Sequence, residues 1–246
     1  MNEIESSQSV ALVSGASGGI GESICSHLVD NGYRVVAAAR NQERLQALAQ
    51  ALGDRLYPLL LDVTDAVAIR SVSRVLPAEL SNPGVLINNA GHDVGGRRLF
   101  EQGSADQWCD IIETNVQGMI RLTHALIDGM LARGCGHIVN MGSIAGLKPY
   151  ASGTAYVSSK YAVHGFSETL RLDYAGRGIR VTEIMPGLVR SGFAEQRLGD
   201  ARQAQEFYDS FEQCLDPEDV ARTVLFALQQ PAHVEIAQLV VLPVSG

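Results

Sequence analysis

The sequence predicts an α/β protein with a doubly wound, mostly parallel sheet of about seven strands and helices on both faces. Three observations support this fold class. Short apolar segments without polar alternation recur along the chain, as expected of strands buried on both faces. Longer stretches with helical patterning separate them and can form right-handed crossovers. Of the 246 residues, 46% are hydrophobic and 19% are charged, which is typical of globular proteins.

The predicted elements alternate from the first strand to the last. Strands are expected at residues 10–13, 33–39, 56–61, 85–88, 137–141, 179–185 and 239–242. Helices are expected at residues 20–31, 42–52, 65–80, 104–133, 154–176 and 217–229. Gly32 and Gly53 follow helix ends, and Asp216 before Pro217 is a plausible N-cap. The polar segment at 187–215 breaks the alternation, and we expect it to be a substrate loop.

Composition and patterning exclude several classes of protein. The formal charge of −8 argues against a nucleic-acid partner. No signal peptide is visible and no apolar run approaches the roughly 18 residues of a membrane helix, so we expect a cytoplasmic protein with no membrane partner. The four cysteines and six histidines show no ligand spacing, so no metal site is expected. No linker or repeat divides the chain, so residues 1–246 are predicted to form a single domain.

A glycine-rich turn follows the first predicted strand. There are 25 glycines, a share above the usual value of roughly 7%, and four of them lie in residues 14–21 (SGASGGIG). Gly15 permits a tight turn, Gly19 lets the backbone approach a diphosphate, and Gly21 allows close packing of helix on strand. The helix N-terminus adds N–H groups and a positive dipole end. The turn therefore predicts the dinucleotide site of a Rossmann fold.

Arg40 predicts which dinucleotide binds. An acidic residue near the end of the second strand would accept hydrogen bonds from ribose hydroxyls and repel a 2′-phosphate. Here Arg40 stands 19 positions after Gly21, and a guanidinium favours the 2′-phosphate by charge and by its fork geometry. We therefore predict that NADP(H) is preferred over NAD(H).

Tyr156 and Lys160 predict the chemistry. Residues four apart share one face of a helix, so Lys160 is expected beside Tyr156. A lysine cation stabilises a phenolate, and we expect it to lower the tyrosine pKa, which makes Tyr156 a general acid–base. Ser143 ends the fifth predicted strand, and its hydroxyl can hold a substrate oxygen against Tyr156.

With these motifs the chain resembles the short-chain dehydrogenase/reductase family over essentially its whole length. Further matches are Asp62-Val63, the run from Asn88 to Gly91, Asn115 and Pro186-Gly187. The resemblance implies hydride transfer between an alcohol and a carbonyl, with a catalytic tetrad of Asn115, Ser143, Tyr156 and Lys160. It implies that the cofactor is bound by Gly15, Ser17, Gly19, Ile20, Gly21, Arg40, Asp62, Val63, Asn89, Ala90, Gly91, Tyr156, Lys160, Pro186, Gly187 and Val189. Homotetramers or homodimers, formed through the helices at 104–133 and 154–176, are also implied.

Two positions depart from the family pattern. Ser14 replaces the usual threonine before the first glycine and keeps the hydroxyl. After Pro186-Gly187, the threonine that often bonds the nicotinamide carboxamide is missing, and Ser191 is the nearest hydroxyl.

The substrate is less well defined. Segments 40–45, 76–79, 186–189, 215–220 and 231–234 are similar to one bacterial branch, the NADP-dependent 3-hydroxy acid dehydrogenases and sulfoacetaldehyde reductases. This similarity implies a small polar hydroxy substrate, and Lys148, Arg190 or Arg197 could pair with its anionic group. Ser143 and Tyr150 are further candidate substrate contacts.

Other functions remain open at this stage. Tyr150, Met185, Phe193 and residues 207–211 could instead line a pocket for an aromatic or cyclic alcohol, or an amino alcohol. A non-catalytic dinucleotide-binding regulator would not need both Tyr156 and Lys160. An epimerase or dehydratase of the extended family would need a longer chain.

Overall fold

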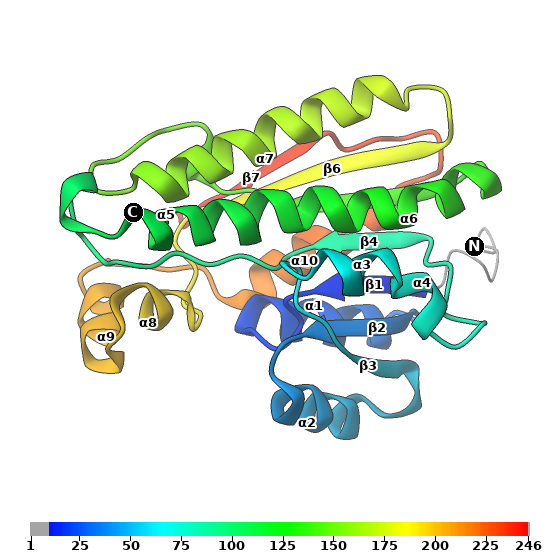
Figure 1. The fold of residues 1–246 in the computed structure, drawn as a ribbon, viewed down its shortest axis with the longest axis horizontal. Helices are drawn as coiled ribbons and strands as arrows, with labels where there is room; N and C mark the ends of the chain where they lie inside the picture. Colours follow the sequence, from blue (N-terminus) through cyan, green and yellow to red (C-terminus); the bar gives the residue numbers. More distant parts are fainter. Residues whose placement is uncertain (1–9, 246) are drawn as a thin grey trace.

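The computed structural model describes residues 10–245. It contains a seven-stranded sheet in the order β3-β2-β1-β4-β5-β6-β7, in which every neighbouring pair is parallel (Figure 1). The strands are β1 (Val10–Ser14), β2 (Arg34–Ala39), β3 (Leu56–Leu60), β4 (Val85–Asn88), β5 (Gly136–Met141), β6 (Ile179–Pro186) and β7 (Gln238–Val241). The predicted fold class is confirmed.

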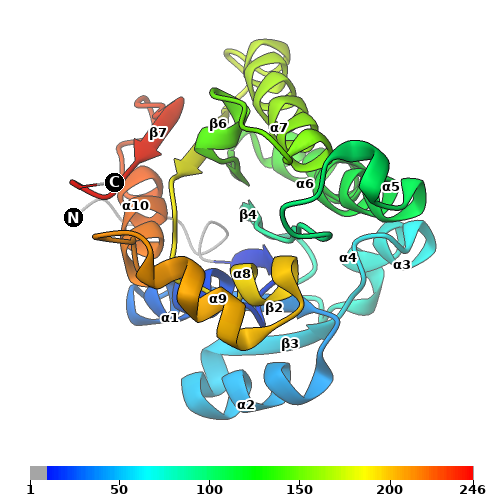
Figure 2. The same ribbon diagram turned by 90° about the vertical axis from the view of Figure 1, so that its left-hand side faces the viewer.

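Helices cover both faces of this sheet (Figure 2). One face packs against α1 (Gly19–Asp30), α2 (Gln42–Leu52) and α10 (Pro217–Leu228). The other packs against α3 (Ala66–Arg70), α4 (Val72–Val75), α6 (Met119–Arg133) and α7 (Thr154–Asp173). Successive side chains of β1 point to opposite faces, so Val13 joins the first layer and Leu12 the second. The central strands β1, β2 and β4 are therefore buried on both sides, which explains their largely apolar sequences, whereas the edge strands β3 and β7 are only partly buried.

The predicted helix at 65–80 is wrong in its second half. Asp65 caps α3 by accepting from the Val67 and Ala68 N–H groups, but the helical hydrogen bonding is disturbed at Ser71. The Ser71 hydroxyl donates to the Val67 and Ala68 carbonyl oxygens, and α3 ends there. Leu76 is extended because Pro77 follows it, so α4 cannot continue.

The predicted helix at 104–133 is interrupted. It consists of α5 (Ala105–Ile112), a π-helical segment η4 (Glu113–Gly118) and α6. Gly118 lies so close to the segment after β3 that a Cβ would come within 2.9 Å of the Val63 side chain. Such π-helical segments are frequent at functional sites, and this one carries Asn115.

The segment 187–215 is more ordered than a loop. It contains α8 (Phe193–Leu198) and α9 (Ala201–Asp209). Gly199 ends α8 in the left-handed conformation, and the Asp200 carboxylate caps α9 by accepting from the Gln203 N–H at 2.8 Å. Two short 3₁₀ turns, η3 (Phe100–Gln102) and η5 (Ile144–Gly146), flank the same end of the sheet, and a third, η2 (Gly53–Arg55), precedes β3.

Candidate active site

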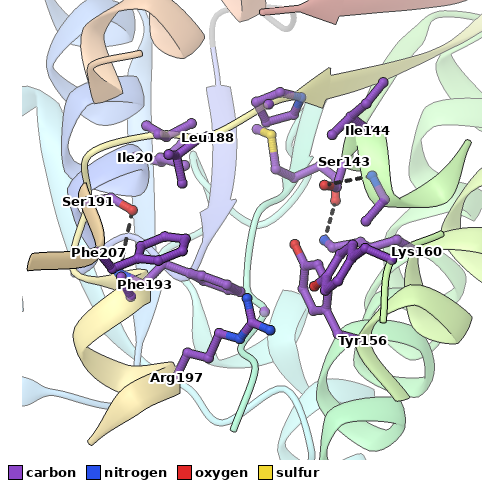
Figure 3. A pocket seen from close by; sticks show the side chains of 18 of the residues that line it. Ile20, Ser143, Ile144, Tyr156, Lys160, Leu188, Ser191, Phe193, Arg197 and Phe207 are labelled. Atoms are coloured by element: carbon purple, nitrogen blue, oxygen red, sulfur yellow. Dashed lines mark hydrogen bonds between the residues drawn. The ribbon is translucent and has the colours of Figure 1, made fainter. Parts of the chain in front are cut away.

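A cavity of about 680 Å³ lies at the carboxyl ends of the strands, a volume usual for small-molecule sites. Its walls come from the first turn of α1, from the segments after β4, β5 and β6, and from α7, α8 and α9 (Figure 3). The sheet order reverses between β1 and β4, which is where open α/β sheets bind ligands. Sequence-predicted residues from each of these segments meet here.

The glycine turn has the conformation that the sequence predicts. Gly15 has φ +65°, and a Cβ there would lie 2.8 Å from the Ala90 Cα. A Cβ at Gly21 would overlap the Gly15 carbonyl oxygen, so α1 packs against the turn only without a side chain. No side chain caps α1, whose N-cap is Gly18. The first N–H groups of α1 are therefore available to a phosphate, and the turn fits a dinucleotide.

The Ser14 hydroxyl joins this turn to the segment after β4. It accepts from the N–H groups of Asn89 and Ala90, both at 3.1 Å, and donates to the Ile87 carbonyl. The Asn89 side chain donates in return to the carbonyls of Ser14 and Gly15. Serine thus supplies the hydroxyl expected of the threonine it replaces.

Arg40 lies at the end of β2, with its side chain 61% exposed. It is 3.9 Å from the Asp62 carboxylate, which also accepts from the N–H and hydroxyl of Thr64. Arg44, which the sequence analysis did not single out, reaches back to the Ser17 carbonyl at 3.4 Å. Its position four residues after Arg40, in the first turn of the helix that follows, was the available signal. Two guanidinium groups therefore lie beside the glycine turn.

Ser143, Tyr156 and Lys160 line the cavity together (Figure 3). The Lys160 ammonium donates to the Met141 carbonyl at 2.8 Å and lies 5.6 Å from the Tyr156 ring centre. The Ser143 hydroxyl accepts from the Ala145 N–H, which fixes its position at the end of β5. These three groups can hold one substrate oxygen and move its proton.

The expectation that the Tyr156 pKa is lowered is wrong for the protein alone. Burial raises the pKa of Tyr156 above its usual value, and a hydrogen bond with Ser143 only partly opposes this. Burial also lowers the pKa of Lys160 to about 8, while the Glu183 carboxylate raises it. The low-dielectric surroundings thus disfavour the charged form of Lys160, which is the form that would stabilise the phenolate.

Asn115 holds the segment after β4 against α7. Its side-chain amide donates to the His92 carbonyl and the Ser159 hydroxyl, both at 3.0 Å, and its oxygen accepts from the His92 N–H at 2.8 Å. A Cβ on Gly91 would lie 3.1 Å from that oxygen and 3.9 Å from the Lys160 ammonium. Asn115 is therefore buried behind the cavity wall at Gly91.

The segment after β6 forms another wall. Pro186, Gly187, Val189 and Ser191 line the cavity from this side, together with Ile20 from the first turn of α1. The Tyr208 hydroxyl donates to the Ser191 carbonyl at 2.6 Å and so links this segment to α9. Ser191 thus places a residue with a hydroxyl in the same wall from which the usual threonine is missing.

The expected substrate cations are not all at the cavity. Lys148 is exposed and Arg190 forms a surface ion pair with Asp209 at 3.4 Å; neither lines the cavity. Sequence spacing cannot determine which way a side chain points, and the structure does not bring these two expected side chains to the cavity. Tyr150 does line it, and so does Arg197.

The proposed apolar lining is present in part. Phe193, Phe207, Tyr208 and Phe211 line the cavity, whereas Met185 is fully buried in β6 and does not. Within residues 10–245 there is no group of three or more histidine, cysteine, aspartate or glutamate residues that could hold a metal ion. In the same range, no helix is long and apolar enough to cross a membrane.

Comparison with known proteins supplies independent information. The family model described as short chain dehydrogenase matches residues 9–201. The NADP-dependent 3-hydroxy acid dehydrogenase YdfG of Escherichia coli K12 is 42% identical, over 96% of this chain and 95% of its own. Sulfoacetaldehyde reductase 2 of Chromohalobacter salexigens is 34% identical, over 95% and 94%. The closed form of a serine dehydrogenase complexed with NADP+ superimposes with a TM-score of 0.93 at 42% identity, covering 96% of this chain and 95% of that one.

Proposed function

The chain belongs to the short-chain dehydrogenase/reductase family, and on that premise we propose that it is an NADP(H)-dependent oxidoreductase that interconverts a small hydroxy acid or hydroxy sulfonate and its carbonyl form. One observation carries this proposal. Ser143, Tyr156 and Lys160 converge in a single cavity beside the glycine turn, so a proton-transfer group and a dinucleotide site adjoin each other.

Each polar residue has a role in the proposed reaction. The bound cofactor supplies or accepts a hydride at its nicotinamide ring. The Tyr156 hydroxyl would donate a proton to the substrate carbonyl oxygen during reduction, and the Tyr156 phenolate would take the proton from the alcohol during oxidation, while Ser143 orients that oxygen. The Lys160 cation stabilises the phenolate. Asn115 positions the wall at Gly91 and would keep a water molecule in a proton relay from Lys160 to solvent.

The cofactor site favours NADP(H). Gly15, Ser17, Gly19 and Gly21 would surround the diphosphate, and Arg40 would bind the 2′-phosphate, with Arg44 adjoining. Asp62 and Val63 would contact the adenine. Asn89, Ala90, Gly91, Ile20, Pro186, Gly187 and Val189 would line the nicotinamide half.

A second substrate class is supported by the cavity wall. Aromatic side chains of α8 and α9, together with Tyr150, supply much of the surface, and they would suit an aromatic or cyclic alcohol. The whole chain would act as one domain, with the segment 187–215 covering the substrate.

Tyr156→Phe tests the proposed mechanism. We expect turnover to fall by about 10²- to 10⁴-fold, the usual contribution of a positioned acid–base group, while the Kd for NADPH stays unchanged. Tyr161→Phe is the matched control, because Tyr161 lies on the same helix and donates its hydroxyl to the Leu147 carbonyl away from the cavity. Near-normal turnover of Tyr156→Phe would contradict the role. NADP+ reduction with 3-hydroxy acids, hydroxy sulfonates, cyclic alcohols and amino alcohols separates the substrate classes.

The protein is also proposed to work in the cytoplasm as a homodimer or homotetramer. Its cysteines are free, which suits a reducing compartment. Ile120 on α6 and Leu172 on α7 are apolar and exposed, consistent with contacts between subunits through these helices. Light scattering of the purified protein measures the assembly directly.

A further inference from the structure

We propose that Arg197, held by Asp93, is the residue that recognises the anionic group of the substrate. This inference rests on the proposed function and adds a specificity determinant to it. It replaces Lys148 and Arg190, which do not line the cavity.

The charge of the cavity is the first observation. The whole chain has a formal charge of −8, yet the residues that line the cavity include Arg97, Lys160 and Arg197 and no aspartate or glutamate. A cavity with positive side chains and no acids favours an anionic ligand, even in an acidic protein.

Of these three cations, Arg197 is the one that is buried at the cavity wall without donating a hydrogen bond to a backbone carbonyl. Lys160 donates to the Met141 carbonyl, and Arg97 is exposed with its guanidinium 5.3 Å from the Phe207 ring centre. The Arg197 side chain is 16% exposed. Figure 3 shows it extending from α8 toward the side of the cavity occupied by Tyr156.

Asp93 forms a buried ion pair with the Arg197 guanidinium, in which the Nε–H group makes no hydrogen bond. The Nε atom of Arg197 lies 2.9 Å from one Asp93 carboxylate oxygen, and the other carboxylate oxygen accepts from the Val94 N–H at 2.9 Å. The guanidinium also lies 5.5 Å from the Tyr150 ring centre. Because the ion pair with Asp93 lies on the Nε side of the guanidinium, the two Nη groups are the ones that can bind a second anion as a fork.

The backbone fixes the same contact from the other side. The Gly96 N–H donates to the Arg197 carbonyl at 3.0 Å, so α8 is attached to the segment after β4 at Arg197 itself. This segment and α8 are about 100 residues apart in sequence. The guanidinium is therefore positioned before substrate binds, which reduces the entropy lost on binding.

The substrate that fits has a hydroxyl or carbonyl at Tyr156 and a carboxylate or sulfonate at Arg197. Either anion can accept two parallel hydrogen bonds from a guanidinium. An uncharged analogue with the same hydroxyl would retain the contacts at Ser143 and Tyr156 but lose those at Arg197.

NADP+ reduction with 3-hydroxybutyrate and with its methyl ester tests this role. We expect Arg197→Met to lower kcat/KM for the acid by about 10- to 100-fold, as for the loss of charge-assisted hydrogen bonds, and to leave the ester and the Kd for NADPH unchanged. Arg202→Met is the control: Arg202 is an arginine of α9 paired with Glu206 on the surface, so neither substrate should respond. If Arg197→Met does not fold, Arg197→Lys, which loses the fork but keeps the charge, should lower kcat/KM for the acid alone.

The outcomes distinguish the two proposals. Equal losses with acid and ester would show that the Arg197–Asp93 pair only anchors α8, and would overturn this inference while leaving the function intact. Wild-type activity without any preference for the acid would overturn it as well. A wild-type enzyme that oxidises neither compound nor 2-hydroxyethanesulfonate would overturn both proposals.

Discussion

Replacing Lys160 by methionine is expected to stabilise the folded protein at neutral pH while abolishing turnover. Lys160 is 7% exposed, and burial lowers its pKa from 10.5 to about 8. A difference of about 2.5 pKa units corresponds to about 3 kcal/mol of destabilisation when the lysine is charged. Methionine removes this destabilisation but leaves the Met141 carbonyl without its hydrogen-bond donor, which costs about 1 kcal/mol. The net gain in the free energy of unfolding at pH 7 is therefore about 2 kcal/mol.

The effect has a defined pH dependence. In the unfolded chain Lys160 keeps its proton up to pH 10.5, whereas in the folded chain it loses it above about pH 8. Between these values the unfolded state binds more protons, so the stability of the wild type rises with pH. The advantage of Lys160→Met is complete below about pH 8 and disappears as the pH approaches 10.5.

Urea unfolding at pH 7 and pH 10, followed by circular dichroism, measures this difference. Lys148→Met is a matched control, because the chain contains just two lysines and Lys148 is exposed; its stability should equal that of the wild type at both pH values. The reasoning is refuted if Lys160→Met is less stable than the wild type at pH 7, or if the difference is the same at both pH values.

Four further substitutions test the cofactor contact, the lysine environment and the helix packing. Arg40→Asp is expected to invert the ratio of kcat/KM values for NADP+ and NAD+ because the 2′-phosphate loses its cation, and an unchanged ratio in steady-state assays would reject that contact. Glu183→Gln should move the alkaline limb of the kcat/KM pH profile to lower pH, since the carboxylate raises the pKa of Lys160; an unmoved limb would argue against this coupling. Gly165→Ala in α7 meets no atom within 4 Å and should stabilise the protein by about 0.5–1 kcal/mol in urea unfolding, whereas Gly21→Ala should destabilise it because its Cβ would overlap the Gly15 carbonyl.

Local sequence signals predicted the sheet and the cofactor side of the site well. The central strands lack a regular polar alternation because both of their faces are covered, so each strand could be predicted from its own residues. The glycine turn is defined by backbone conformation and close packing, which only glycine permits at Gly15 and Gly21. Tyr156 and Lys160 are one helical turn apart, so their proximity also follows from the sequence.

Local signals failed where competing short-range interactions decided the backbone. The helix predicted at 65–80 ends early because the Ser71 hydroxyl bonds to the preceding turn and Pro77 follows Leu76. The cap at Asp200 was a readable signal for α9 that the polarity of the segment 187–215 obscured.

The sequence by itself determined the positions of the strands along the chain, the glycine turn and the Tyr156–Lys160 pair, because each depends on residues that are neighbours in the chain. The tertiary structure decided which cationic side chains reach the cavity and how far the pKa of Lys160 is lowered. Asp93 and Arg197 come together only when α8 packs on the segment after β4, and the Lys160 pKa falls because surrounding elements exclude water from it. Orientation and solvation depend on contacts between distant segments, and no local spacing encodes them.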